Sequence, residues 1–173
     1  ENMPMYIGHE PSGVVCDGDF DFNSRVAVEP GRSCIDCSWV IRGKHNLSPK
    51  VRFMGANSKG AFSDYVIVHK SQLVKIPDTM SFNMAALLEP FGVALHSINL
   101  LNVRMLDSVL IVGGGPIGLC IMYLCKMIGC SRIHMVDHHD YRMRYAEEHG
   151  ATVGDFNEKF SCVFDCSGNN SSI

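Results

Sequence analysis

The stretch Val109-Leu110-Ile111-Val112-Gly113-Gly114-Gly115-Pro116-Ile117-Gly118 decides how the second half of this 173-residue chain folds. Its first four residues form an unbroken apolar run, which is typical of a parallel strand covered on both faces. The glycines match G-x-G-x-x-G and lead into an apolar helical segment that should end at Gly129. Pro116 falls near the start of this helix, where a missing N–H costs little. The stretch therefore predicts a strand, a tight turn and a helix.

Strands and helices continue to alternate after this stretch. A second strand is expected at 133–136, a helix at 140–148 closed by Gly150, and a later strand at 162–166. Alternation of this kind indicates right-handed crossovers and an open parallel sheet. We predict an α/β domain of the doubly wound Rossmann type over residues 91–173.

The part of the chain before residue 90 has a different pattern, with short apolar runs bounded by glycine, proline, aspartate and asparagine. This pattern predicts a small, largely antiparallel β domain over residues 1–90. The expected strands are 12–15, 25–28, 62–68 and 73–76. Ser81 could cap a helix that runs through 85–88, and Pro90 should end or kink it, which makes this helix the candidate domain junction.

The glycine pattern also predicts a nucleotide site. Gly113 would permit the tight turn, Gly115 would leave room for a pyrophosphate, and Gly118 would let the helix pack closely on the strand. Asp137 ends the next strand, 19 residues after Gly118. Its carboxylate would accept hydrogen bonds from the adenosine ribose and repel the 2′-phosphate of NADP, which favours NAD. The predicted cofactor site is completed by Pro116, Ile117 and Arg142.

Each of these features has a simpler interpretation. The glycines could form an ordinary turn, and Asp137 could be a solvated strand end. The adjacent His138 and His139 could suggest a metal, but we expect them to be loop histidines rather than ligands.

Composition narrows the choice of partner. The chain has 15 Lys and Arg against 18 Asp and Glu, for a net charge of −3, so it lacks the basic footprint of a nucleic-acid or membrane-surface binder. The longest apolar stretch, Leu119 to Cys130, contains Lys126 and is shorter than the ~20 residues that span a bilayer. We expect a small-molecule partner, no nucleic acid and no membrane.

The remaining general features indicate an intracellular protein. Its first residues lack the basic and apolar regions of a signal peptide. The eight cysteines are an even number, but most lie in apolar runs, where cysteine behaves as a small hydrophobic residue. We expect reduced thiols and a cytoplasmic location.

Two short motifs in the β-rich part are weak metal signals when taken alone. Gly8-His9-Glu10 offers a histidine and a carboxylate, and Cys34-x-x-Cys37 has the spacing of half a zinc knuckle without a second pair in register. Glu89, beside Pro90, could face either a cleft or solvent.

Together these motifs, in this order, resemble those of the zinc-dependent medium-chain dehydrogenases. Within that superfamily the chain is most similar to the polyol branch of sorbitol, xylitol and idonate dehydrogenases, with threonine dehydrogenase close by. The resemblance implies part of a GroES-like catalytic domain followed by part of a Rossmann domain. It rests on Gly8–Gly13, Arg25–Gly31, the segment from Cys34 to Pro49, Leu88–Pro90 and Gly113–Gly118.

The same resemblance implies roles for individual residues. His9 would be a ligand of the catalytic zinc, Glu10 a ligand or near-ligand, and Glu89 the acid that binds the zinc or holds its water. All three are therefore counted as metal and catalytic residues. Phe53 would form a wall of the substrate pocket.

The chain departs from the family pattern at three places. The family's cysteine ligand to the catalytic zinc would lie upstream of Glu1. Of the four cysteines that hold a structural zinc, only Cys34 and Cys37 are kept, with Val40 and Ser48 at the other two positions. The nucleotide domain would continue beyond Ile173. We expect one catalytic zinc, no structural zinc, and an internal fragment of an enzyme that forms homo-oligomers at full length.

The sequence thus predicts an enzyme that transfers a hydride from a secondary alcohol, such as a polyol, to NAD with the help of zinc, the fragment alone being inactive. One alternative is a truncated or degenerate nucleotide-binding paralogue without catalysis. Another is the zinc-free quinone-reductase branch, which would leave His9-Glu10 and Asn46-Leu47-Ser48-Pro49 unexplained.

Overall fold

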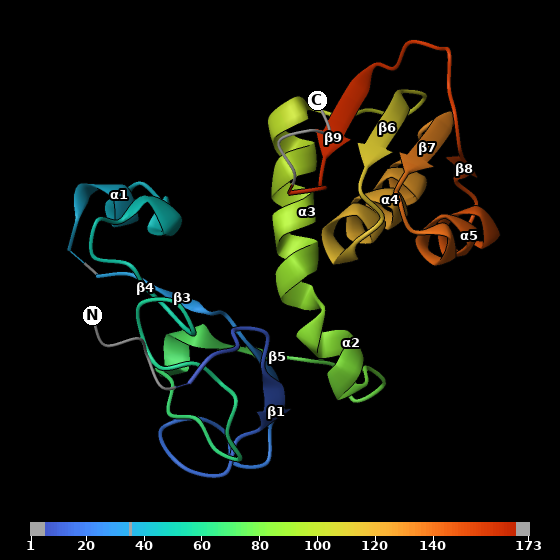
Figure 1. Cartoon of the computed structure of the whole chain (residues 1–173). Coiled ribbons are helices and arrows are strands. Elements are labelled where there is room, and N and C mark those ends of the chain that lie inside the picture. The colour runs from blue at the N-terminus through green and yellow to red at the C-terminus, as the bar shows by residue number, and fades with distance from the viewer. Residues whose placement is uncertain (1–5, 35, 169–173) are drawn as a thin grey trace. The chain divides into compact units, whose positions relative to one another are not determined.

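The computed structural model describes residues 6–34 and 36–168. The chain forms two compact units, Glu1–Glu89 and Pro90–Ile173 (Figure 1). Within the described ranges, no helix is long and apolar enough to cross a bilayer.

The second unit is built on a parallel sheet of four strands in the order β8-β7-β6-β9 (Figure 1). Its strands are β6 (Ser108–Val112), β7 (Arg132–Val136), β8 (Thr152–Val153) and β9 (Cys162–Asp165). Its helices are α3 (Leu88–Leu101), α4 (Pro116–Ile128) and α5 (Asp140–Glu148). Because the steps from β6 to β7 and from β7 to β8 go in the same direction, right-handed crossovers place α4 and α5 on one face. The predicted parallel α/β architecture is confirmed.

The core of this unit is centred on β6. Val109 and Ile111 have no exposed surface, and Leu110 between them is only 6% exposed, so the strand is covered on both faces as predicted. Met135 of β7 and Met122 of α4 are also fully buried against this strand layer.

Helix α4 begins and ends where the sequence predicts. Pro116 is its first residue, where no N–H is needed. Gly129 caps the other end with φ of +88°, a left-handed conformation that glycine adopts without strain, and its N–H donates to the carbonyls of Cys125 and Lys126.

The first unit is β-rich. Its main sheet is antiparallel in the order β1-β2-β5, and β3 pairs with β4 in a second, two-stranded sheet. Ala27, Ile76 and Ala85 are buried beside this main sheet. The elements are β1 (Ser12–Val14), β2 (Arg25–Val28), β3 (Gly31–Arg32), α1 (Ser38–Ile41), η1 (His45–Leu47), β4 (Arg52–Phe53), η2 (Lys70–Gln72), β5 (Leu73–Lys75) and α2 (Phe82–Ala86).

The prediction of a strand at 62–68 is wrong. The segment has the side-chain spacing of a strand, but a strand needs a backbone partner along its length. The N–H of Phe62 donates to the carbonyl of Ile7 at 3.0 Å. Beyond Phe62, the described residues of this segment form no series of backbone hydrogen bonds to a neighbouring strand. Tyr65 and Ile67 are accordingly exposed, at 78% and 101%.

The helix that the sequence predicts after Ser81 ends earlier than expected, and Pro90 lies within the next helix. Ser81 caps α2 as predicted, accepting a hydrogen bond from the N–H of Met84, but α2 already ends at Ala86. Helix α3 then begins at Leu88 and places Pro90 in its first turn, where proline fits without losing a helical hydrogen bond.

None of the eight cysteines, all of which lie within the described residues, is in a disulfide. Cys120 and Cys125 are buried in the core of the second unit, where they act as small apolar side chains.

Candidate functional site

The loop that carries His9 is held by backbone hydrogen bonds to a segment about fifty residues later in the chain. The N–H of Gly60 donates to Tyr6, that of Ala61 to Gly8, and that of Phe62 to Ile7, each at 3.0 Å. This short backbone pairing fixes the chain direction immediately before His9.

Glycines allow this pairing to be close. A Cβ added at Gly60 would lie 2.3 Å from the carbonyl oxygen of Ile7, and one added at Gly55 would lie 2.7 Å from that of Gly8. Gly55 also has φ of +75°, which side chains rarely adopt. These two positions therefore require glycine if the His9 loop is to keep its place.

Three predicted metal residues come together in the first unit. His9, Glu10 and Glu89 each offer one ligand atom, and these atoms all lie within 4.8 Å of one another. His9 and Glu89 are half-buried, whereas Glu10 is exposed. The cluster therefore combines an imidazole from the first loop with a carboxylate from the start of α3.

The charges in this cluster are unbalanced. Burial raises the pKa of Glu89 above its usual value; the charge of His9 opposes this rise, and the carboxylates of Glu10 and Glu29 add to it. A cation held among these groups would relieve the repulsion. Imidazole nitrogen and carboxylate oxygen are ligands that Zn²⁺ accepts, so the residues present fit a zinc ion.

A cavity of about 520 Å³ opens beside His9 and Glu10. Its apolar lining includes Ile7 and Phe62, so a small organic molecule could lie against the cluster. Phe62 was missed by the sequence analysis because it was assigned to a strand. The signal that could have found it is its position directly after Gly60-Ala61.

Phe53, the predicted wall of the substrate pocket, lies next to His9 but not on this cavity. Its ring centroid is 5.4 Å from that of His9, at an interplanar angle of 56°. The cavity that Phe53 lines is another, of about 710 Å³, whose lining also includes Cys34 and His45. Phe53 therefore supports the imidazole from the side, while Phe62 faces the space next to the cluster.

The glycine-rich turn of the second unit has the geometry that each glycine was expected to provide. Gly113 has φ of +102°, and an added Cβ would lie 2.8 Å from the backbone of Cys166. At Gly118 the Cβ would lie 2.0 Å from the carbonyl oxygen of Gly113. At Gly115 it would meet nothing within 4 Å.

Open space in front of Gly115 lies at the N-terminus of α4, because Gly115 is the residue that precedes the helix. The first N–H groups of a helix have no partner within it and favour negative charge. A side chain at Gly115 would occupy this space, which glycine leaves open for an anionic group such as a diphosphate.

Asp137 lies at the same edge of the sheet, because Val112 and Val136 are paired at the ends of β6 and β7. Its side chain is only 2% exposed. Oδ2 accepts hydrogen bonds from the N–H of Gly114 at 2.7 Å and from Nη1 of Arg142 at 3.2 Å.

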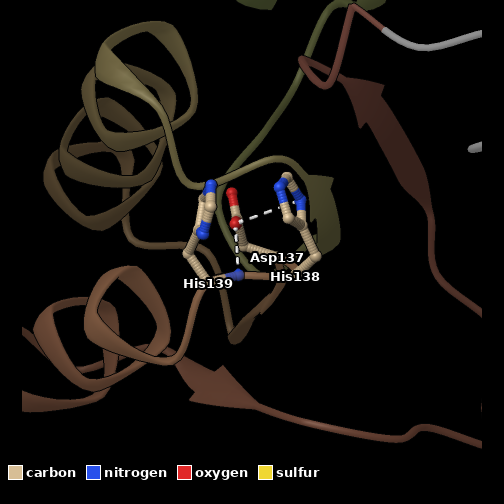
Figure 2. A group of neighbouring side chains, drawn as sticks. All are labelled: Asp137, His138 and His139. Atoms are coloured by element: carbon tan, nitrogen blue, oxygen red, sulfur yellow. Dashed lines mark hydrogen bonds and ion pairs between the residues drawn. The ribbon is translucent and has the colours of Figure 1, made fainter.

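Figure 2 shows the two histidines that follow Asp137. The N–H of His139 donates to Oδ1 at 2.8 Å, and Nδ1 of the exposed His138 lies 3.6 Å from the same oxygen. Although burial favours the neutral carboxyl, the hydrogen bonds from His139, Gly114 and Arg142 lower the pKa of Asp137. Asp137 is therefore an anion at neutral pH.

Asp137, His138 and His139 also bring three possible metal-ligand atoms within 4.8 Å of one another. Because the oxygens of Asp137 already accept hydrogen bonds from two backbone N–H groups and Arg142, the carboxylate is held as part of the turn. These hydrogen bonds hold the Asp137 carboxylate at the same end of the sheet as the open space at Gly115.

The Cys34 and Cys37 lobe does not fit a structural zinc. Such sites use four sulfur or nitrogen ligands. Here the two sulfurs lie 3.3 and 3.4 Å from the hydroxyl of Ser48, and the described residues bring no third thiol or imidazole to them.

Comparison with known proteins adds independent findings. Residues 1–78 match the alcohol dehydrogenase GroES-like domain. The chain is 37% identical over 159 residues to an uncharacterized zinc-type alcohol dehydrogenase-like protein, YdjJ, of Escherichia coli K12, covering 88% of this chain and 46% of that protein. It is also 37% identical over 154 residues to L-idonate 5-dehydrogenase of Vitis vinifera, covering 86% and 42%.

A solved structure of an alcohol dehydrogenase has a similar fold. The alcohol dehydrogenase rspB of Escherichia coli CFT073, complexed with the cofactor NADH, superposes with a TM-score of 0.86 at 28% identity and covers 94% of this chain and 54% of that one. The chain thus spans less than half the length of the curated relatives it matches.

Proposed function

This chain belongs to the zinc-dependent medium-chain dehydrogenases, and on that premise we propose that it oxidises a secondary alcohol, a polyol or a related hydroxy compound, with NAD as hydride acceptor. The meeting of His9, Glu10 and Glu89 beside an apolar-lined cavity is the observation that carries the proposal. We also propose that the full-length enzyme is cytoplasmic and forms homo-oligomers, as expected from the sequence.

His9, Glu10 and Glu89 would hold the zinc. When bound, the metal supplies a Lewis acid that lowers the pKa of an alcohol hydroxyl by several units. Phe53 supports the His9 imidazole from the side, and Glu89, whose pKa is raised by burial, would take up the proton from the substrate hydroxyl.

The cavity beside the cluster would take the substrate. Ile7 and Phe62 supply apolar surface, while Glu10 offers a polar group at the same cavity. An alcohol with an apolar backbone face and several hydroxyls is compatible with such a lining.

For the cofactor, the bare cradle at Gly115 would receive the pyrophosphate against the N-terminus of α4. Asp137 would accept the ribose hydroxyls. Arg142 is already paired with Asp137, so it is not free to attract a 2′-phosphate, and NAD is preferred over NADP. Pro116 and Ile117 form the first turn of α4 beside this cradle.

A second candidate is nucleotide binding without catalysis. It is favoured by one observation: Glu10, one of the three possible metal ligands, is exposed, so its carboxylate is held less firmly than the half-buried side chains of His9 and Glu89.

Measuring zinc content and NAD-dependent oxidation of sorbitol, xylitol and threonine on the full gene product distinguishes the candidates. We expect bound zinc, turnover of at least one alcohol, and loss of both in His9→Ala but not in His96→Ala, which replaces an exposed histidine of α3 outside the cluster. An active enzyme without metal would reject the zinc proposal. An inactive, metal-free protein that still binds NADH would favour the second candidate.

A further inference from the structure

Two thiols and a buried hydroxyl form a cluster that the proposed function does not use. Sγ of Cys37 lies 3.4 Å from Oγ of Ser48, and Sγ of Cys34 lies 3.3 Å from the same oxygen. Ser48 is only 3% exposed, whereas both cysteines are half-buried. The hydroxyl therefore holds the two sulfurs next to each other while reagents can still reach them.

The position of Ser48 is fixed from a second side. The N–H of Lys50 donates to Oγ of Ser48 at 3.3 Å, so the hydroxyl is held by its own turn as well as by the thiols. Cys37 precedes α1, and Cys34 lines the cavity of about 710 Å³. A small oxidant can therefore reach Cys34 through that cavity, and Cys37 is itself only half-buried.

We propose that Cys34 and Cys37 are a redox-active dithiol that hydroperoxides oxidise to an intramolecular disulfide. The lobe lacks the ligands for a structural zinc, so its two remaining thiols are free to do this chemistry. The inference is independent of the alcohol oxidation proposed above.

The environment activates Cys37. The Ser48 hydroxyl, followed by the N–H of Val40, lowers the pKa of the Cys37 thiol to about 7, against a small opposing effect of burial, and Cys34 adds to the lowering. The thiolate is the nucleophilic form. Cys37 is therefore the attacking sulfur and Cys34 the resolving one.

The reaction proceeds in two balanced steps. The Cys37 thiolate attacks one oxygen of hydrogen peroxide, the O–O bond breaks, and hydroxide leaves, giving a sulfenic acid and, after protonation, water. The sulfur of Cys34, losing its proton to solvent, then attacks the Cys37 sulfur and displaces the sulfenic oxygen as a second water. Two thiols and one peroxide thus yield one disulfide and two waters.

The other cysteines provide the contrast. Burial raises the pKa of Cys125 to about 12 and that of Cys166 to about 11, so both stay protonated at neutral pH. Burial also raises the pKa of Cys130 and of Cys162. Cys16 is exposed and serves as the reference thiol within the same chain.

The expected rate advantage can be worked out. At pH 6 a thiol of pKa about 7 is roughly 9% thiolate, against roughly 0.3% for an ordinary thiol of pKa about 8.5, a ratio of about 30. Its lower basicity reduces nucleophilicity about fivefold, which leaves a net advantage of about sixfold. This advantage shrinks to about threefold at pH 7.

The test treats the whole chain, freed of metal by chelator, with a slight excess of hydrogen peroxide, alkylates the remaining thiols and digests with trypsin. Cleavage after Arg32 and Arg42 puts both cysteines in one peptide, 33–42. We expect this peptide to lose two hydrogens and escape alkylation, while the peptide with Cys16 remains alkylated. Competition with iodoacetamide from pH 5 to 9 should give a midpoint near 7 for Cys37.

Two variants keep the test decisive. Cys34→Ser should stop at the sulfenic acid, trapped by dimedone on Cys37, and Ser48→Ala should move the alkylation midpoint upward without preventing folding, because one small side chain replaces another. Cys16→Ser is the matched control and should change neither the disulfide that peroxide forms nor the alkylation midpoint of Cys37. If Cys37 reacts no faster than Cys16 at pH 6, or if peroxide joins other cysteines first, the proposal is wrong.

Discussion

Replacing Gly118 with alanine tests the packing that holds the glycine-rich turn. The added Cβ would lie 2.0 Å from the carbonyl oxygen of Gly113 and 3.2 Å from Cγ2 of Ile111. An ordinary carbon–oxygen contact is about 3.3 Å, so the turn and α4 must separate by roughly 1.3 Å. The atom that must move is backbone, which cannot swing aside as a flexible side chain could.

The cost can be estimated from this geometry. Overpacking of a core costs about 1–3 kcal/mol, and a collision with backbone places Gly118→Ala at the upper end. Alanine gains about 1 kcal/mol over glycine inside a helix, which leaves a net loss of about 2 kcal/mol. For a unit of this size that corresponds to a fall in Tm of roughly 8–16 °C.

Thermal unfolding followed by circular dichroism, with NADH fluorescence titration, measures both consequences. Gly92→Ala in α3 is the matched control, because its Cβ would meet nothing within 4 Å and the variant should be as stable as the parent or more so. We expect Gly118→Ala to lose stability and NADH affinity together. A Gly118→Ala protein as stable as the Gly92→Ala variant would refute the packing argument.

Three further predictions follow from single residues. His9→Ala should weaken zinc binding, measured by equilibrium dialysis, by at least roughly 10- to 100-fold, which is what losing a residue hydrogen-bonded to a metal ligand costs. An unchanged zinc affinity would show that His9 is not a ligand. Ser81→Ala should cost about 1 kcal/mol in urea unfolding, because the N–H of Met84 loses its cap, and an unchanged midpoint would contradict this. The lowered pKa of Asp137 contributes stability that is fully present above its unfolded value of about 3.9 and lost as pH falls through the lower folded pKa. Asp137→Asn should therefore be less stable than the parent at pH 6, with the difference shrinking below about pH 4; a constant difference would show that the carboxylate charge plays no part.

The second unit could be predicted from sequence because its signals are local. The apolar run Val109–Val112 and the stop at Gly129 each define an element without reference to distant residues, and both are found where expected. The anchoring of Asp137 by Gly114 and Arg142 was not foreseen, since it depends on how the strand ends align in the folded sheet.

The first unit was less predictable because its contacts are distant in sequence. Periodicity in 62–68 gives the spacing of side chains but cannot say whether a partner strand runs beside them, and only Phe62, the first residue of this segment, pairs with another segment. Phe62, which lines the cavity beside His9, was assigned to this strand and not to a pocket, whereas Phe53 was expected as a pocket wall only through the family resemblance. The approach of Glu89 to His9, eighty residues earlier, was expected only through the family resemblance.

NADH binding by this chain is the most direct test of the account, measured by calorimetry on the parent and on Gly115→Ala. Because a Cβ at Gly115 meets nothing within 4 Å, the variant should fold as the parent does, yet its methyl group would occupy the space meant for the pyrophosphate. The account predicts one NADH site in the parent and at least about tenfold weaker binding in the variant. No heat of binding in the folded parent, or equal affinity in both proteins, would contradict it.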